Sequence, residues 1–248
     1  ATMTVVKDSG NRKIYDGNDR ADTSNFVVDA DDQAILSKDG LLNDVVITAR
    51  YGDKHASVNP GEADSNSKTI TYTLALNDNS GNYAIATPSA VAQGDIERRK
   101  VYVDGTNAVA APKDYDGNTD LPTGTDYNAM GFGLRDADST TGLVTGDSDL
   151  KLDATQVEGH YVSPDVKRAA DGSVIAQNIN FTGFTLNDTD TGNDNSINDY
   201  VVIDADGSGV IKPLPVTVGI VAAPTKTYDG TTAIAAANNN VVVTGGPL

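Results

Sequence analysis

Short runs of alternating apolar and polar residues, separated by Gly, Asn and Asp, extend along the whole chain. In Lys68–Leu76, every second residue from Ile70 to Leu76 is apolar and Thr or Ala lies between. Side chains alternate between the two faces of a strand, so this pattern predicts a strand with one buried face. The first hundred residues hold further runs that predict strands: Thr2–Lys7, Asn25–Val28, Asp44–Arg50, Tyr83–Ala86 and Lys100–Val103. We find no helical periodicity and expect an all-β chain.

A change of phase marks one later strand. Ile179 and Phe181 alternate with polar residues, and the alternation resumes at Phe184 and Leu186 after a slip at Gly183. One glycine at such a slip predicts a β-bulge.

Two prolines mark another segment, Ile211–Ile220. Pro213 and Pro215 lie within it, and Leu214, Val216 and Val218 share one face. Because proline lacks an N–H group, we expect this strand at a sheet edge or where one repeat passes into the next.

A motif that contains Tyr-Asp-Gly occurs three times, and its tyrosines Tyr15, Tyr115 and Tyr228 are separated by 100 and 113 positions. A second landmark repeats in the same order: Leu76-Asn77-Asp78 precedes Tyr83, and Leu186-Asn187-Asp188 precedes Tyr200. A period of this size fits small β-sandwich domains rather than a solenoid. We therefore expect tandem Ig-like or Greek-key β-sandwich domains in an elongated array, at 1–103 and 104–218, with an incomplete third repeat at 219–248.

The motif residues have one simple structural interpretation. Asp caps its own backbone and Gly accepts a positive φ, so each copy predicts a turn that anchors a tyrosine in the core. The motif residues are Lys13, Tyr15, Asp16, Gly17, Lys113, Tyr115, Asp116, Gly117, Lys226, Tyr228, Asp229 and Gly230. Two alternatives stay open: a ligand-recognition loop with exposed tyrosine rings, and a spontaneous isopeptide bond between a lysine and an Asn side chain.

The chain carries a formal net charge of −17 and no cysteine. This charge disfavours nucleic acid and anionic membranes as partners, because phosphate binding depends on Lys and Arg. No apolar run is long enough to predict insertion into a membrane. A cation or a basic partner suits the chain better.

Acidic clusters offer oxygen ligands for calcium, which takes six to eight of them. The best candidates for a calcium site are Asp188, Asp190, Asp194, Asp204 and Asp206. The alternative is an acidic surface that only keeps the protein soluble. Calcium is the only cofactor that we expect.

Catalysis has little support in the sequence. His55 and His160 lie in different repeats and share no motif, so a Ser-His-Asp triad is not indicated. Pairs of carboxylates are frequent here by composition alone. We expect no enzymatic activity.

The chain resembles the YDG-type repeat domains of large bacterial surface proteins, including filamentous haemagglutinin-like adhesins. The residues that carry the resemblance are Lys-x-Tyr-Asp-Gly at 113–117 and 226–230, Thr231-Thr232, the late Leu-x-Leu followed by Asn-Tyr, and the closing segment 211–218. Asn18 and Asn118 depart from the threonine that the family often has. The resemblance implies a secreted, extracellular, mainly β module and no catalytic residues.

These observations lead us to expect a structural repeat segment of a bacterial extracellular adhesin or surface filament. Its partners would be neighbouring repeats, copies of itself, or host and matrix glycans, with no nucleic acid and no membrane insertion. One alternative is a filament subunit that polymerises head to tail by strand addition through Val216–Val218 and Val241–Val243. Another is a carbohydrate- or mucin-binding module that uses exposed Tyr, Asn and Asp.

Overall fold

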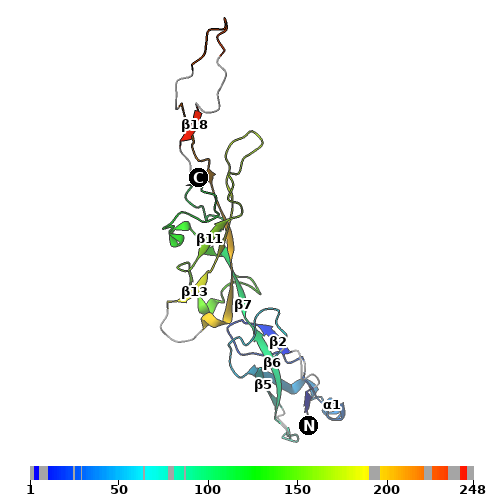
Figure 1. The fold of residues 1–248 in the computed structure, drawn as a ribbon. Helices are drawn as coiled ribbons and strands as arrows, with labels where there is room; N and C mark the ends of the chain where they lie inside the picture. Colours follow the sequence, from blue (N-terminus) through cyan, green and yellow to red (C-terminus); the bar gives the residue numbers. More distant parts are fainter. Residues whose placement is uncertain are drawn as a thin grey trace. The chain divides into compact units, whose positions relative to one another are not determined.

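The computed structural model describes residues 3–5, 11–24, 26–28, 30–63, 65–77, 81–86, 88–189, 196–220, 225–233 and 241–244 (Figure 1). These residues lie mostly in β-strands with little helix, so the predicted β-rich class is confirmed. No helix in these ranges has the length and apolar character needed to cross a membrane.

The chain forms two compact units that are not consecutive in sequence. Unit 1 comprises Ala1–Asp104, Phe132–Gln156 and Gly183–Ala205, and unit 2 comprises Gly105–Gly131, Val157–Thr182 and Asp206–Leu248. The first break, after Asp104, lies next to the boundary expected at 103. The segments 132–156 and 183–205, however, pack with the first unit, although the repeat spacing places them in the second repeat.

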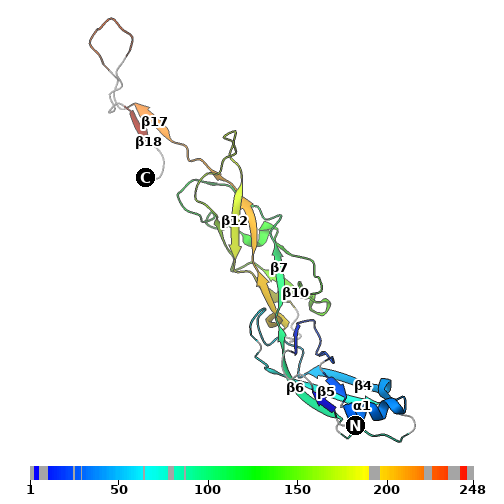
Figure 2. The same cartoon turned by 90° about the vertical axis from the view of Figure 1, so that its right-hand side faces the viewer.

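A four-stranded sheet forms one part of unit 1, and its order is β2-β6-β5-β4 (Figures 1 and 2). The strands are β2 (Asn11–Ile14), β4 (Val45–Tyr51), β5 (Lys68–Leu76) and β6 (Ser89–Glu97). The pair β2–β6 is parallel, and β4–β5 and β5–β6 are antiparallel. The strand predicted at Lys68–Leu76 is confirmed, and its Ile70, Tyr72 and Leu74 are buried.

The remaining strands of unit 1 explain why parts of the second repeat belong to it. The central strand β7 (Arg99–Asp104) pairs in parallel with β14 (Tyr200–Ile203) and antiparallel with β9 (Gly133–Leu134). Two further antiparallel pairs complete the unit: β1 (Met3–Val5) with β3 (Phe26–Val28), and β10 (Leu150–Asp153) with β13 (Thr185–Asp188). The short 3-10 helices η1 (Leu42–Asp44), η3 (Thr145–Asp147) and η4 (Ser196–Asp199) lie between strands.

Unit 1 also contains a helix that the sequence did not lead us to expect, α1 (Ala30–Lys38) (Figure 2). Asp31 and Asp32 lie in its first turn and Lys38 in its last, where each charge stabilises the helix dipole. Leu36 is its buried residue. The prediction of no helix was wrong. The apolar residues of this segment show little helical periodicity, but the charges at its ends and its residues of high helix propensity stabilise a helix.

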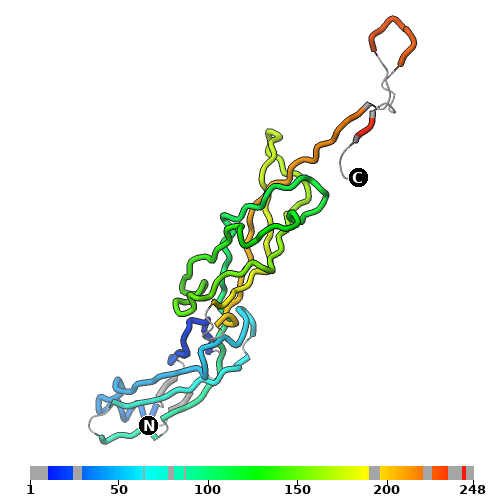
Figure 3. Tube along the Cα trace, turned by 90° about the vertical axis from the view of Figure 1, so that its left-hand side faces the viewer, coloured from blue at the N-terminus to red at the C-terminus, as the bar shows by residue number. Residues whose placement is uncertain are grey.

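Unit 2 contains the sheet β11-β12-β15, formed by β11 (Glu158–Tyr161), β12 (Gln177–Thr182) and β15 (Ala205–Gly209). Two smaller pairs accompany it: parallel β8 (Lys113–Asp114) with β16 (Ile211–Lys212), and antiparallel β17 (Thr217–Ile220) with β18 (Val241–Thr244). The 3-10 helix η2 (Tyr127–Met130) precedes Gly131. In Figure 3 the traces around 120 and 160, which share a β-bridge, lie side by side.

Three strand predictions need correction. Tyr83–Ala86 is not a strand. At Gly183 there is no bulge, because the strands before and after it, β12 and β13, pair with different partners and the chain passes between them with φ +93°. The segment Ile211–Ile220 is two short strands, because the residues from Pro213 to Val216 join neither.

Candidate functional site

Each Tyr-Asp-Gly motif folds into a turn closed by its lysine, and the copy at Lys113 shows the arrangement fully. The ammonium Nζ lies 2.9 Å from both the backbone oxygen and Oδ1 of Asn118, 2.8 Å from the oxygen of Asp120 and 2.8 Å from Oδ1 of Asp116. The lysine side chain is only 6% exposed. Gly117 takes φ +81°, the left-handed region that glycine accepts without strain.

The other two copies repeat these bonds. Lys13 Nζ donates to Oδ1 of Asp16 at 2.7 Å and to the oxygen of Asn18 at 2.6 Å. Lys226 Nζ donates to Oδ1 of Asp229 at 2.8 Å and to the oxygen and Oγ1 of Thr231 at 2.7 and 3.0 Å. A threonine hydroxyl therefore replaces the asparagine amide oxygen without loss of the turn.

The aspartate of the motif holds the turn by accepting from the backbone two residues later. Its Oδ1 accepts from the N–H of Asn118 at 3.1 Å and, in the third copy, from the N–H of Thr231 at 2.9 Å. The hydrogen bond from the lysine, followed by these backbone bonds, lowers the pKa of Asp116 and of Asp229. Both carboxylates are therefore ionised over a wide pH range.

These bonds give the lysine a role that needs no covalent link. An ammonium group has three N–H donors and no acceptor, and here oxygen atoms surround it. An isopeptide bond with an asparagine would require a neutral amine instead. At Lys226 the motif carries Thr231, so the amide partner of the other copies is replaced by a hydroxyl.

The first two motifs also share their surroundings. Tyr15 N donates to Glu97 O at 2.9 Å, and Tyr115 N donates to Lys212 O at 2.8 Å. The two lysine ammonium groups lie over tyrosine rings, at 5.7 Å from the Tyr51 centroid and 5.8 Å from the Tyr161 centroid. The two repeats thus build the same local structure around the motif, each in its own unit.

The three motif tyrosines differ sharply in exposure. Tyr15 is 0% exposed, Tyr115 is 37% exposed and Tyr228 is 92% exposed. Anchoring of the ring in a core, expected for all three, holds for Tyr15 alone.

Tyr15 belongs to a buried tyrosine–carboxylate cluster in unit 1, formed by Tyr15, Asp147 and Tyr200. Both phenols donate to Oδ2 of Asp147, at 3.0 Å from Tyr15 and 2.7 Å from Tyr200. The N–H of Val144 donates to the Tyr200 hydroxyl at 3.1 Å. Asp147 is 3% exposed, so the two phenols replace the water that its carboxylate would otherwise bind.

Burial, followed by the nearby Asp147, raises the pKa of Tyr15 well above its ordinary value. Burial likewise raises the pKa of Tyr200, and its hydrogen bond to Asp147 adds to the shift. Both phenols therefore remain protonated donors, which is the form that a buried carboxylate requires. The cluster is suited to holding segments together rather than to proton transfer near neutral pH.

Arg99 supports the same region. Its guanidinium is buried and donates to the backbone oxygens of Gly142 at 2.7 Å, Thr141 at 2.9 Å, Ser139 at 3.2 Å and Tyr15 at 3.3 Å. A planar guanidinium presents several donors in a fixed fork, so one side chain can fix a whole loop. Arg99 thereby ties residues 139–142 to the end of β2.

A histidine–aspartate pair joins two other segments of unit 1. His55 Nδ1 lies 2.8 Å from Oδ2 of Asp199, and Ala56 N donates to Oδ1 of Asp199 at 2.6 Å. Burial raises the pKa of Asp199, whose exposure is 1%. The second histidine, His160, lies in unit 2 beside Asp120, with Nδ1 3.0 Å from Oδ1.

Asp95 occupies a hydrogen-bonded cage at 0% exposure. Its carboxylate accepts from the N–H groups of Ser65, Asn66 and Ser67 at 2.9 to 3.0 Å and from the hydroxyls of Ser65 and Ser67 at 2.7 and 2.8 Å. Burial opposes ionisation, but these bonds outweigh it and lower the pKa of Asp95. The cage fixes loop 65–67 beside β6.

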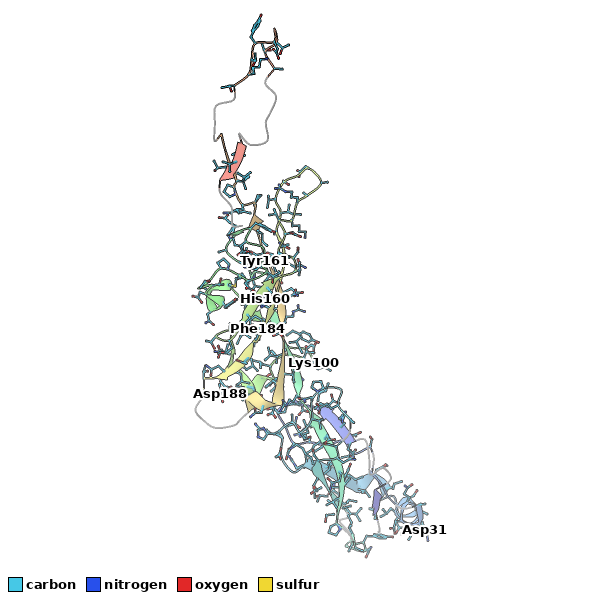
Figure 4. All side chains as sticks on the ribbon, in the orientation of Figure 1. Asp31, Lys100, His160, Tyr161, Phe184 and Asp188 are labelled. Carbon is cyan, nitrogen blue, oxygen red and sulfur yellow. The ribbon has the colours of Figure 1, made fainter. Side chains whose placement is uncertain are left out.

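The predicted calcium ligands do not form a site within the described ranges. Asp188 ends β13 (Figure 4), Asp204 follows β14 and Asp206 lies on β15. Asp190 and Asp194 lie outside the described residues. In the part of the chain that the structure describes, no group of three or more His, Asp or Glu side chains is placed to hold a metal ion. A calcium site stays a prediction.

Comparison of the chain with models of protein families, with curated proteins and with solved structures finds no match.

Sequence reasoning missed most of these buried polar residues. Asp147, Asp199 and Asp95 are three among many aspartates, and only packing distinguishes them. One signal was present: Tyr200 belongs to the Leu-to-Tyr landmark that repeats with Tyr83. In the second repeat, that landmark ends at the tyrosine that meets Tyr15 of the first motif.

Proposed function

We propose that this chain is a structural segment of repeat modules from a bacterial extracellular adhesin or surface filament, without catalysis. The proposal includes tandem β domains in an extended array, with repeats near 1–103, 104–218 and 219–248. It is supported by the resemblance of the Tyr-Asp-Gly motifs to YDG-type repeat domains and by the lysine-closed turn that all three motifs form.

One observation carries the proposal: a motif tyrosine of the first repeat is sealed by residues of the second. Tyr15 contacts Asp147 and Tyr200, which lie 132 and 185 positions later. Residues of two consecutive repeats therefore build one buried cluster in unit 1, which supports an array in which neighbouring repeats fold together.

The polar groups also favour a structural role. The buried Asp147, Asp95 and Arg99 have hydrogen-bond partners within the protein, so their polar atoms are used in holding loops. The net charge of −17 would keep such arrays apart at low salt.

For the topology of each domain, the parallel pairs β2–β6, β7–β14 and β8–β16 favour a mixed sheet. Ig-like sandwiches are built from antiparallel sheets. We therefore propose an array of β domains that contain mixed sheets, in preference to an array of Ig-like sandwiches.

Surface labelling tests the proposal. An antibody raised against the 248-residue chain should label intact producing cells, and protease treatment of those cells should remove the label. Detection of the protein only after the cells are permeabilised would contradict an extracellular role.

A second candidate is a carbohydrate- or mucin-binding module, which the 92% exposure of Tyr228 favours. An exposed tyrosine offers a ligand an apolar ring face and a polar hydroxyl. A glycan array separates the two: selective binding that Tyr228→Ala abolishes would support the module. Absence of binding would leave the structural role as the better account.

A further inference from the structure

One cavity of unit 1, with a volume of about 590 Å³, has a lining that the proposed function does not use. It is lined by β9 and the residues that follow it (133–137), by residues 143–145 and 148, and by residues 150–152 of β10. All of these residues belong to unit 1. The volume lies in the range of ligand-binding sites in proteins.

Two strands line this cavity, and each lies at the edge of its sheet. β9 pairs with β7 and β10 pairs with β13, and neither has another partner strand among the described residues. Arg135 N donates to the backbone oxygen of Tyr102 on β7 at 3.0 Å. Neighbouring residues in a strand direct their backbone groups to opposite edges, so the N–H and C=O of Leu134 point away from β7. A strand edge of this kind can accept a further strand.

The side chains of both strands are divided between two faces. Leu134 and Leu150 pack in the core of unit 1, whereas Arg135 and Lys151 are exposed. This follows the alternation of side chains along a strand. The Arg135 guanidinium lies over the Tyr102 ring, 5.7 Å from its centroid, on the solvent side of β7. Each strand therefore presents leucine to the core and a cation to solvent.

The apolar lining between the two strands is held in place by the tyrosine–carboxylate cluster. Leu143 and Val144 line the cavity and pack against the core. The N–H of Val144 donates to the Tyr200 hydroxyl at 3.1 Å, and its C=O accepts from the N–H of Asp147 at 3.0 Å. A lining that is already ordered loses little conformational entropy when a ligand binds.

The charges of the lining favour an acidic ligand. Arg135 and Lys151 are its two cations and Asp136 is its carboxylate, so the site is net positive in a chain with a net charge of −17. Lys151 Nζ donates to the backbone oxygen of Ser148 at 2.7 Å. An ammonium group has three donors, so this bond does not prevent a second one to a carboxylate.

The positions of these cations define the kind of strand that fits. A strand placed between β9 and β10 has a cation beside its solvent face on each side. Acidic side chains on that face form favourable cross-strand pairs, whereas basic ones are repelled. Apolar side chains on its other face meet the leucines of β9 and β10.

We propose that this groove binds an extended peptide, in which apolar and acidic residues alternate, as a strand between β9 and β10. Backbone hydrogen bonds to the two strand edges hold the peptide. Its apolar side chains cover Leu134, Leu143 and Leu152, which are only partly buried, and its acidic side chains pair with Arg135 and Lys151. This binding site goes beyond the proposed function and does not require an extracellular location.

Fluorescence anisotropy with the full chain and the labelled peptide Thr-Val-Glu-Val-Glu-Val-Thr tests the proposal. This peptide should show saturable binding. Two control peptides should bind at least about tenfold more weakly: Thr-Val-Val-Val-Glu-Glu-Thr, which lacks the alternation, and Thr-Val-Lys-Val-Lys-Val-Thr, which is basic. Methylation of the peptide N–H groups on either edge should also weaken binding, because a strand between two others bonds on both edges.

Two charge reversals test the assigned residues. Arg135→Glu and Lys151→Glu should each weaken binding of the acidic peptide by about three- to tenfold. Both positions are exposed, so folding should survive, and circular dichroism checks this. Lys167→Glu, at an exposed lysine of unit 2, is the matched control and should leave binding unchanged. The double variant Arg135→Glu/Lys151→Glu should prefer the basic peptide to the acidic one.

Three results would overturn the proposal: no saturable binding of the acidic peptide, equal binding of the control peptides, or unchanged affinity in both charge-reversal variants. Dodecanoate serves as a competing probe. If it binds while the peptide does not, the groove is a site for small amphipathic anions and the proposal is wrong. None of these results bears on surface labelling of cells, which tests the proposed function separately.

Discussion

The ring of Tyr15 packs edge-on against the ring of Tyr200, with 5.5 Å between centroids and 81° between planes. Both hydroxyls meet on one oxygen of Asp147. The pair therefore combines an aromatic contact with two hydrogen bonds to a buried charge.

Removal of one hydroxyl tests the contribution of this cluster. Tyr15→Phe keeps the ring and deletes one of the two phenol donors to Asp147, and should lower the free energy of unfolding by about 1.5–3 kcal/mol. Urea denaturation measures the change. Tyr115→Phe, at the half-exposed equivalent position, is the matched control and should change stability by less than about 0.5 kcal/mol. Equal effects at both positions would contradict a special role for the cluster.

Alkaline pH should destabilise unit 1 through the same phenols. Their pKa values are raised in the folded protein, so the unfolded chain loses these protons first, from about pH 10 upward. Stability is then fully present below that pH and falls as the pH rises, by about 1.4 kcal/mol per pH unit for each phenol. Denaturation curves between pH 9 and about 11 should show a shallower fall in the double variant Tyr15→Phe/Tyr200→Phe. An unchanged slope would show that other groups cause the loss.

The lysine turn gives a comparison within one chain. Lys113→Met leaves several oxygens without their donor at a site only 6% exposed, and should cost about 1–3 kcal/mol of stability. Lys226→Met, at a site 26% exposed, should cost less than about 1 kcal/mol. Thermal unfolding of both variants decides this.

Asn118→Thr should be nearly neutral, within about 0.5 kcal/mol, because Thr231 already fills the same position in the third turn. A large loss would mean that the amide has a role that the hydroxyl cannot take, such as covalent chemistry. Intact mass would then be measured to look for the loss of one ammonia.

Gly94 on β6 allows close packing against β2, the strand that leads into the first motif. A Cβ added at Gly94 would lie 2.2 Å from Asn11 O and 2.8 Å from Ile70 Cδ1. Gly94→Ala should therefore destabilise the protein by at least about 1–3 kcal/mol. Gly133→Ala, where nothing lies within 4 Å, is the control in the same unit. The prediction fails if chemical denaturation finds both variants equally stable.

Calcium can be tested without knowing its ligands. If the acidic residues predicted from the sequence hold a structural ion, EDTA should lower the melting temperature and added Ca²⁺ should restore it. The same treatment of a variant with Asp188→Asn and Asp204→Asn should have less effect. A melting curve that EDTA does not change would exclude a structural calcium site.

Alternation of apolar and polar residues predicted a strand correctly where one face of the strand is buried and the other is exposed. Lys68–Leu76 is such a case, and its observed bounds are those expected. Tyr83–Ala86 has a similar composition but is not a strand. Strand formation there depends on a partner strand, which local pattern does not reveal.

The site was harder to predict because its residues are distant in sequence. The motif drew attention to Tyr15, but Asp147 and Tyr200 meet it only after the second repeat folds back on β7. The repeat spacing indicated consecutive domains at 1–103 and 104–218, whereas the packing assigns parts of the second repeat to unit 1. The sequence alone does not show that segments of the second repeat pack in the first unit.

The burial of Tyr15 also determines where the chain can be divided for study. A fragment that ends at 104, the natural choice from the repeat spacing, would keep Tyr15 and lose both residues that cover it. Such a fragment would expose an aromatic ring and the valines of β7 to water, and should aggregate or unfold more readily than the full chain. A fragment that ends after β14, at about residue 205, keeps every segment of unit 1. Studies of single modules should therefore start from that longer piece.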